Sequence, residues 1–495
     1  MDIITGLSLG ITTALQWSNL GWCLLGVTLG TLVGVLPGIG TLTALSLLLP
    51  MTFHMDITGA IIMLAGVYYG TSYGCSITSI LLNIPGTPAS SVTCLDGYPM
   101  SQQGRGGVAL LLTALASFAG GIIGILLLIF FSTSISELAY AFGSAEYFSI
   151  MLLGLVSASV MSNTAIERNF VMVVMGMLLG MIGIDMASGQ PRFDFGIAGL
   201  IDGINVAVVA MGLFGVAEVI DRLCMYQPQA NVKEPGSMKP NRDDWRRSIG
   251  SCLRGTGIGS FFGTLPGTGP AVASFVSYTV EKHISDDPKR FGQGAVEGVV
   301  APEAANNAAA QTEFIPTLSL GIPGDATMAL ILAALIIQGV APGPMLISNQ
   351  PALFWGVVVS FFVGNVMLLI LNIPLIRIWT SILRIPYGFI YPVILALMAL
   401  GAYSINLSSL DVILVMIFGV LGWLMRRSDL DAVPLLLGFV LGPIMEEQFR
   451  KTLTISQGDF TVFVTRPLSL AFILASVTLV VWAVLRNHRS TQLAR

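Results

Sequence analysis

GVLPGIG at residues 34–40 and GTLPGTG at residues 263–269 are two copies of one pattern, and each copy interrupts a long apolar segment. A second pair of motifs follows in the same order, IPGT at residues 84–87 and IPGD at residues 322–325. The copies are separated by 263 − 34 = 229 and 322 − 84 = 238 residues. Two motifs that recur in order at similar spacing indicate an internal duplication.

The composition is that of a protein that crosses a membrane. Of the 495 residues, 54% are hydrophobic and only 10% are charged, whereas soluble domains carry about 25% charged residues. Several apolar runs approach the roughly 20 residues that span a bilayer as a helix; they include 108–131, 170–184, 197–216, 353–373 and 468–485. They lack the alternation of a membrane strand, so we predict an all-α polytopic membrane protein.

The duplication predicts two homologous repeats with discontinuous helices and roughly 12 to 14 membrane segments in total. The N-terminal membrane repeat covers residues 1–225, a polar cytoplasmic linker covers 226–247, and the C-terminal membrane repeat covers 248–495. Repeats of this kind are either parallel or inverted. Inverted repeats are favoured here, because they place the two breaks opposite each other near the bilayer midplane, as in secondary transporters.

The few charges and reactive side chains exclude several classes of function. Lys and Arg recur through residues 221–254, which indicates a cytoplasmic position, but the net charge of −4 gives no footprint for nucleic acid. The chain has no Gly-Lys pair of a phosphate-binding loop, and its 3 histidines and 5 cysteines lack the spacing of metal ligands. We therefore do not expect an enzyme.

The Pro-Gly breaks expose backbone groups that a continuous helix would satisfy internally. Proline removes a donor and glycine adopts angles denied to other residues, so the motif suits the end of one helix and the start of another. The second half-helix can then hold an anion at its N-terminus, and free carbonyls can coordinate sodium. The candidates here are Gly38, Gly40, Thr41, Gly267, Thr268 and Gly269 for substrate, and Thr43 and Thr264 for sodium. A packing kink without a ligand is the alternative.

The IPG pair differs in chemistry between the halves. The candidate substrate ligands are Asn83, Gly86, Thr87, Ser90 and Gly324, and the candidate sodium ligands are Asp325 and Thr327. A carboxylate at membrane depth is functional by default, although a wet interfacial loop would also hold Asp325. The preceding stretch 58–82 is rich in Tyr, Thr and Ser, so it must face protein or water rather than lipid.

The run PEAANNAAA at residues 302–310 places adjacent amides among small residues. On a helix, Glu303, Asn306 and Asn307 would lie on nearly one face. The amides of Asn306 and Asn307 can bind a carboxylate substrate or can hydrogen-bond to neighbouring helices.

Together, the two GxLPGxG motifs, the IPG pair and the PEAANNAAA run resemble the large membrane subunit of tripartite tricarboxylate transporters, the TctA family, over essentially the whole chain. The resemblance implies a multi-pass secondary importer of the bacterial inner membrane that moves citrate or other carboxylates. It also implies a sodium or proton gradient as the driving force, a small four-helix membrane subunit and a periplasmic substrate-binding protein. The family motifs fall on Gly34, Pro37, Gly38 and Gly40, on Gly263, Pro266, Gly267 and Gly269, and on Glu303, Asn306 and Asn307.

No arginine lies within the break motifs. We therefore expect half-helix N-termini, Thr and Ser hydroxyls, and Asn306 or Asn307 to hold the carboxylate, with no cofactor and Na⁺ as the candidate coupling ion. Two other classes remain as alternatives: an ungated anion channel, and an intramembrane hydrolase that uses Asp325 with a second carboxylate. Either sliding of a transport domain or rocking of the two halves fits the sequence.

Overall fold

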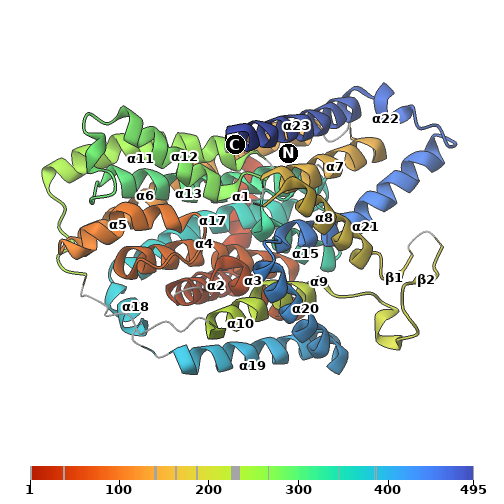
Figure 1. Ribbon diagram of the computed structural model, residues 1–495, viewed down its shortest axis with the longest axis horizontal. Helices are drawn as coiled ribbons and strands as arrows, with labels where there is room; N and C mark the ends of the chain where they lie inside the picture. Colours follow the sequence, from red (N-terminus) through yellow and green to blue (C-terminus); the bar gives the residue numbers. More distant parts are fainter. Residues whose placement is uncertain are drawn as a thin grey trace.

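The computed structural model is almost entirely helical (Figure 1). It describes residues 3–36, 39–138, 142–161, 164–185, 188–224, 235–265, 267–343, 345–383, 385 and 387–493. Within these ranges, 8 helices are long and apolar enough to cross a membrane, and shorter apolar helices accompany them. The prediction of an all-α polytopic membrane protein is confirmed.

The first half contains α1 to α10 and a small hairpin of two strands. Its elements are α1 (Ile3–Ala14), α2 (Trp17–Val35), α3 (Thr41–Leu48), η1 (Leu49–His54), α4 (Ile57–Leu82), α5 (Ser90–Gln102), α6 (Gly106–Leu138), α7 (Ser144–Met161), α8 (Ile166–Gly180), β1 (Gly183–Ile184), β2 (Pro191–Arg192), η3 (Ala198–Leu200), α9 (Val206–Ala210), the π-helical η4 (Met211–Val216) and α10 (Ala217–Cys224). Strand β1 pairs with β2 in antiparallel register, Gly183 opposite Arg192.

The second half contains α11 to α23. Its elements are α11 (Arg242–Gly263), α12 (Gly269–Ile284), η5 (Pro288–Arg290), α13 (Glu297–Thr312), α14 (Phe314–Leu320), α15 (Ala326–Ile337), α16 (Leu346–Asn349), α17 (Pro351–Asn372), α18 (Ile376–Ile382), α19 (Tyr387–Asn406), α20 (Ser409–Arg427), α21 (Ala432–Ile455), α22 (Val462–Thr465) and α23 (Pro467–Leu493). Helix α11 begins inside the range expected to be a linker, where Asn241 and Asp244 form a capping box.

Both expected breaks are present, and two apolar runs differ from expectation. Helix α2 ends at Val35 and α3 begins at Thr41, while α11 ends at Gly263 and α12 begins at Gly269. The run 170–184 stops being helical at Gly180, because the glycines, proline and aspartates of 181–203 favour turns. The run 197–216 begins with a 3₁₀ turn and continues as α9 and η4 rather than as one uniform α-helix.

Helix α4 lies at the centre of the molecule, between α2 and α17 (Figure 1). All of its apolar span is buried, whereas only 11% of the span of α23 is. The hydroxyl-rich stretch 58–82 therefore faces protein, as its composition predicts, and α23 is left to face lipid.

In the first half, α2 packs backbone to backbone against α4. A Cβ added to any of three glycines of α2 would overlap a carbonyl oxygen of α4; these pairs are Gly26 with Met63, Gly30 with Val67 and Gly34 with Thr71. Small residues at a four-residue spacing let membrane helices approach this closely.

In the second half, α11 packs against α13 in the same way. The overlapping pairs are Gly255 with Ala301, Gly259 with Ala305 and Gly263 with Ala309. Each glycine of α11 follows the matching glycine of α2 by 229 residues (255 − 26 = 229). Each contacted residue of α13 follows the matching residue of α4 by 238 residues (301 − 63 = 238). These are the separations of the two motif pairs, so both helix pairs have the same packing register.

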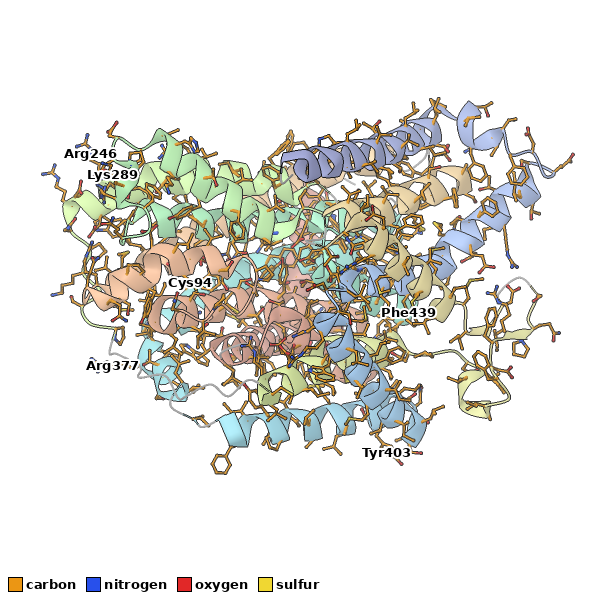
Figure 2. All side chains as sticks on the ribbon, viewed as in Figure 1. Cys94, Arg246, Lys289, Arg377, Tyr403 and Phe439 are labelled. Carbon is orange, nitrogen blue, oxygen red and sulfur yellow. The ribbon has the colours of Figure 1, made fainter. Side chains whose placement is uncertain are left out.

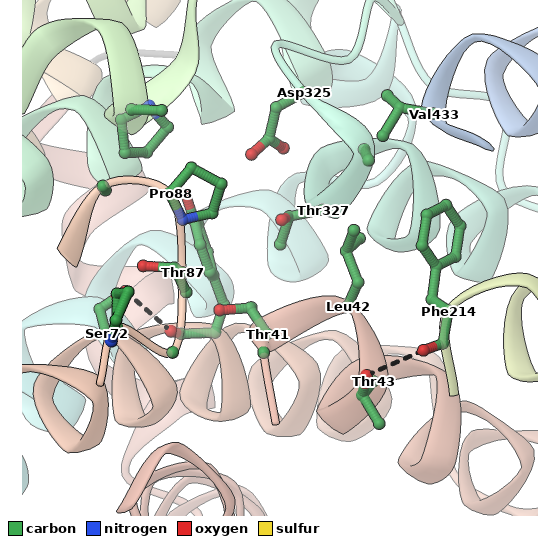
Figure 3. Close-up of a pocket in the computed structure, with 18 of the residues that line it drawn as sticks. Thr41, Leu42, Thr43, Ser72, Thr87, Pro88, Phe214, Asp325, Thr327 and Val433 are labelled. Atoms are coloured by element: carbon green, nitrogen blue, oxygen red, sulfur yellow. Dashed lines mark hydrogen bonds between the residues drawn. The ribbon is translucent and has the colours of Figure 1, made fainter. Parts of the chain in front are cut away.

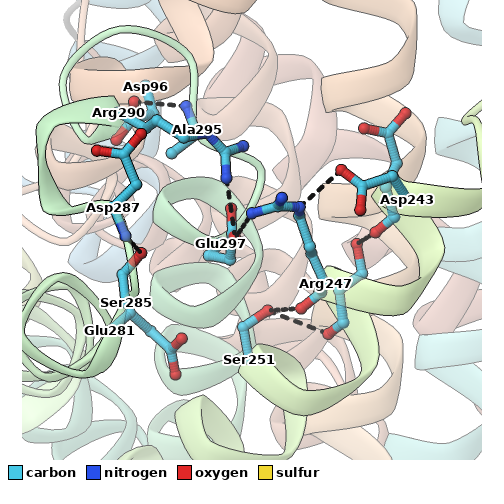
Figure 4. Close-up of polar contacts among 12 residues, drawn as sticks. Asp96, Asp243, Arg247, Ser251, Glu281, Ser285, Asp287, Arg290, Ala295 and Glu297 are labelled. Carbon is cyan, nitrogen blue, oxygen red and sulfur yellow. Dashed lines mark hydrogen bonds and ion pairs between the residues drawn. The ribbon is translucent and has the colours of Figure 1, made fainter.

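Basic side chains mark one end of the molecule. Figure 2 shows Arg246, Lys289 and Arg377 at the same end of the long axis. Near this end, Arg247 bridges Asp243 (2.7 Å) and Glu297 (3.0 Å), as Figure 4 shows. The contact with Glu297 joins α11 to the first turn of α13, on the side that the sequence predicts to be cytoplasmic.

The close approach of α11 and α13 can be tested with two glycines of one helix. In Gly259→Ala, the new methyl group would overlap the Ala305 carbonyl, so we expect a stability loss of about 1–3 kcal/mol. Gly257→Ala is the matched control, because nothing lies within 4 Å of its added Cβ. Thermal unfolding of the purified chain in detergent measures the melting temperature of both variants. Equal melting temperatures would contradict the packing described here.

Candidate functional site

A cavity of about 580 Å³ lies where the motifs of the two halves meet (Figure 3). Its wall includes Gly40 and Gly86 from the first half and Gly267 and Gly324 from the second. This volume is within the range of about 300–1,000 Å³ that is typical of small-molecule sites. The cavity is therefore the candidate substrate site.

Most of the candidate residues that the structure describes are brought together here. Those that line the cavity are Gly40, Thr41, Gly86, Thr87, Gly267, Asn306 and Gly324 among the substrate candidates, and Thr43, Asp325 and Thr327 among the sodium candidates. In Figure 3, Asp325 and Thr327 lie across the cavity from Thr41 and Thr87.

Several candidates lie outside the cavity wall because local structure uses them. Asn83 is exposed and ends α4 with a left-handed backbone (φ 59°). Ser90 exchanges hydrogen bonds with Thr87, donating to its carbonyl oxygen at 2.9 Å. The hydroxyl of Thr264 donates to the carbonyl of Phe261 at 2.7 Å. These side chains stabilise helix ends rather than face the cavity.

Three further candidates, Thr268, Gly269 and Asn307, are also absent from the cavity wall. Thr268 donates its hydroxyl to the carbonyl of Leu265 at 2.9 Å, and Asn307 donates its amide to the Glu303 carbonyl of its own helix at 3.0 Å. Gly269 (φ +56°) packs against the side chain of Asp325. Gly38 lies outside the described residues.

Within each half, the broken helix touches the IPG loop at a backbone carbonyl. The Gly267 N–H donates to the Gly324 carbonyl at 2.9 Å. A Cβ added to Gly40 would lie 2.9 Å from the Gly86 carbonyl oxygen, closer than real Cβ contacts. Glycine is therefore required at residue 40 by the approach of another backbone, and Gly267 is further fixed by a φ of +80°.

Helices from both halves begin at the cavity wall. Helix α3 begins at Thr41 and α15 at Ala326, and both residues line the cavity. Helix α12 begins beside Gly267 and Pro270, and α5 begins beside Ala89. Each N-terminus carries a partial positive charge from unsatisfied N–H groups. The arrangement favours a bound anion.

The side-chain oxygens of the wall are partly engaged already. Asp325 caps α15 by accepting from the Met328 N–H at 2.8 Å, and Thr43 donates to the Phe214 carbonyl at 3.1 Å. In the described part of the chain, no group of three or more His, Cys, Asp or Glu side chains is placed to hold a metal ion. Sodium at Thr43, Asp325 and Thr327 remains a prediction, and Thr264 lies apart from them.

Two arginines also line the cavity, and sequence reasoning missed them. Glu218 lies between them and pairs with Arg222 at 2.9 Å and with Arg426 at 2.5 Å. They belong to α10 and α20, outside the motifs. The signal in the sequence is a Glu–Arg pair at i, i+4 at the end of an apolar run. The arginines bring two positive charges to a wall that also carries the carboxylates of Glu218, Asp325 and Asp431.

Of the two adjacent asparagines, only Asn306 lines the cavity, and this difference is directly testable. The thiol introduced by Asn306→Cys lines the cavity, so a water-soluble thiol reagent should modify it roughly tenfold faster than the buried thiol introduced by Asn307→Cys, because modification requires an accessible thiolate. Mass spectrometry of the labelled chain measures both rates, with the unsubstituted chain as the background. Equal labelling of the two variants would contradict this placement.

Comparisons with known proteins agree with the motifs. The model of the tripartite tricarboxylate transporter TctA family matches residues 20–437. An uncharacterized 52.8 kDa protein in the TAR-I ttuC' 3' region of Agrobacterium vitis is 47% identical over 491 residues, which cover 99% of this chain and 98% of that protein. An uncharacterized protein in the TAR-II ttuC' 3' region of the same organism is 50% identical over 232 residues, or 47% of this chain and 96% of that protein.

No solved structure gives a significant match to the chain. The family match covers well over half of the sequence and includes both break motifs and both IPG motifs. The chain therefore belongs to the tripartite tricarboxylate transporter TctA family.

Proposed function

We propose that this chain is the transmembrane subunit of a secondary active importer that moves citrate-like tricarboxylates or related carboxylates across the bacterial inner membrane. TctA is a transporter family whose tripartite name implies further subunits. In our proposal these are a small four-helix membrane subunit and a periplasmic substrate-binding protein that delivers the carboxylate. A sodium or proton gradient drives import.

The observation that carries this proposal is the convergence of helix N-termini from both halves on one cavity. The N-termini of α3 and α15 lie in its wall. Discontinuous helices of transporters hold anionic substrate groups at such termini. Because lipid cannot satisfy the free backbone groups, they are tolerated only around protein or a water-filled cavity. A small carboxylate fits the volume of the site, where the helix N-termini and two arginines lie beside the carboxylates of Glu218, Asp325 and Asp431.

The arginines extend this recognition beyond the backbone. Arg222 and Arg426 share Glu218, so the three side chains together carry one net positive charge. An arriving carboxylate competes with Glu218 for the guanidinium groups, which bind carboxylates strongly and in a fixed geometry. Asn306, which also lines the cavity, supplies a neutral donor.

The two alternative functions explain less of the geometry. An ungated channel does not account for the matched breaks. The carboxylate of Asp325 accepts a backbone N–H as the cap of α15, which is a structural task that a hydrolytic residue does not need. The importer is the function that the site supports best.

Uptake of radiolabelled citrate into vesicles tests the function. The vesicles contain this chain and its small membrane partner, with or without the binding protein, under a sodium or a proton gradient. We expect accumulation that requires both the binding protein and one gradient. Uptake that equilibrates without a gradient would indicate a channel and contradict the proposal.

The arginine pair makes a sharper prediction within the same assay. Arg426→Gln removes a charge-assisted hydrogen bond worth about 1.5–3 kcal/mol, so we expect the apparent affinity for citrate to fall by about tenfold or more. Arg427→Gln is the matched control, because Arg427 lies over the Trp423 ring, 5.5 Å from its centroid, and does not line the cavity. Concentration dependence of uptake measures both variants. An equal loss of citrate affinity in the two variants would assign the effect to surface charge rather than to the cavity.

A further inference from the structure

Glu313 is a fully buried carboxyl group directly behind the wall of the cavity. It lies between α13 and α14 and has a relative exposure of 0%. The hydroxyl of Tyr68, which lines the cavity, donates to its Oε1 atom. A Cβ added to Gly324, another lining residue, would lie 2.9 Å from its Oε2 atom. Two wall residues therefore separate Glu313 from the substrate.

The environment of Glu313 does not suit a permanent negative charge. Its Oε2 atom has no hydrogen-bond partner among the described residues. The neighbouring Phe314 packs against Phe361 with ring centroids 4.7 Å apart, and both rings pack against Tyr69. An ionised carboxylate in such surroundings is far more costly than a neutral one.

The charged groups around Glu313 are acidic rather than basic. Tyr68 and Tyr69 face it from α4, and Asp325 acts on it from the start of α15. Helix α13 carries Glu297 and Glu303, while α15, α16 and the described side chains of α6 carry no charged residue. Within the described residues, the ion pairs of the chain do not include Glu313. A proton is the simplest means to neutralise it.

We propose that Glu313 is the proton-carrying residue of the transport cycle, with Tyr68 linking it to the cavity. This inference rests on the proposed function. The Glu313 carboxylate takes one proton from cavity water and becomes a neutral acid when substrate enters from the outside. It returns that proton to water when the cavity opens to the inside, so one proton moves with each substrate.

The coupling follows from electrostatics across the thin wall. A carboxylate substrate brings negative charge next to Asp325 and Glu313, and like charges at short range oppose one another. Protonation of Glu313 removes one of these charges, so proton and substrate favour each other's binding by the same factor. Ionised Glu313 with bound substrate is therefore the disfavoured combination, so that binding of the substrate is linked to protonation of Glu313.

The test uses Glu313→Gln, which has the shape of the protonated side chain and cannot release a proton. Vesicles with the complete transporter, free of sodium, are assayed for citrate counterflow without a gradient and for accumulation under a proton gradient. We expect the variant to retain counterflow and to lose gradient-driven accumulation. When affinity is expressed for a single ionisation state of citrate, it should fall with rising pH in the unsubstituted protein toward about tenfold per unit, the slope of one linked proton; in the variant it should not.

Two controls separate this inference from the proposed function and from misfolding. Glu167→Gln changes an exposed glutamate at the start of α8 and should behave as the unsubstituted protein. Retained counterflow shows that Glu313→Gln is folded; if the unsubstituted protein itself lacks counterflow, the proposed function fails. Infrared spectroscopy of the purified chain then still tests Glu313, because the variant should lose a protonated-carboxyl band whether or not transport is observed.

Any of three results would overturn the role of Glu313. One is normal accumulation and normal pH dependence in the Glu313→Gln variant. Another is accumulation in the unsubstituted protein that follows a sodium gradient and ignores a proton gradient. An infrared spectrum that the substitution leaves unchanged would equally contradict a protonated Glu313.

Discussion

The close contact of helix backbones at glycine is the constraint on which the rest of this structure depends. Helix α2 meets α4, and α11 meets α13, with glycines directly against carbonyl oxygens. Because the last of these glycines, Gly34 and Gly263, are also the first residues of the break motifs, the packing register fixes where each helix stops. Side chains at the interface would separate the helices and displace the breaks. The same register in both halves supports the predicted duplication.

The position of the breaks determines the chemistry of the cavity. Each break lies against an IPG loop, and new helices begin from these points at the wall of one shared cavity. A continuous helix would satisfy those groups internally and would present nothing to a substrate. Because lipid offers no hydrogen-bond partners, each polar group that is not paired within the protein must face water or a ligand. In the proposed function, anion binding thus depends on the backbone, with Arg222 and Arg426 as additional ligands.

Much of this could be predicted from the sequence, because it depends on local rules. The Pro-Gly breaks, the burial of the hydroxyl-rich helix α4 and the gathering of Thr41, Thr87 and Asp325 all follow from residue type and duplication. The features that escaped prediction depend on distant contacts. Asn306 and Asn307 are adjacent and point in directions about 100° apart on a helix, so neighbouring helices decide which one reaches the cavity. Glu313 is distinctive only because Gly324 and Tyr68, which is 245 residues away in the sequence, enclose it.

The central claim is that the cavity between the two sets of breaks holds the carboxylate. The most direct test is an experimental structure of the assembled transporter with bound citrate. The account predicts ligand density between the N-termini of α3 and α15, within hydrogen-bond distance of backbone N–H groups from both halves. Citrate bound elsewhere in the chain, with this cavity occupied only by side chains or lipid, would contradict it.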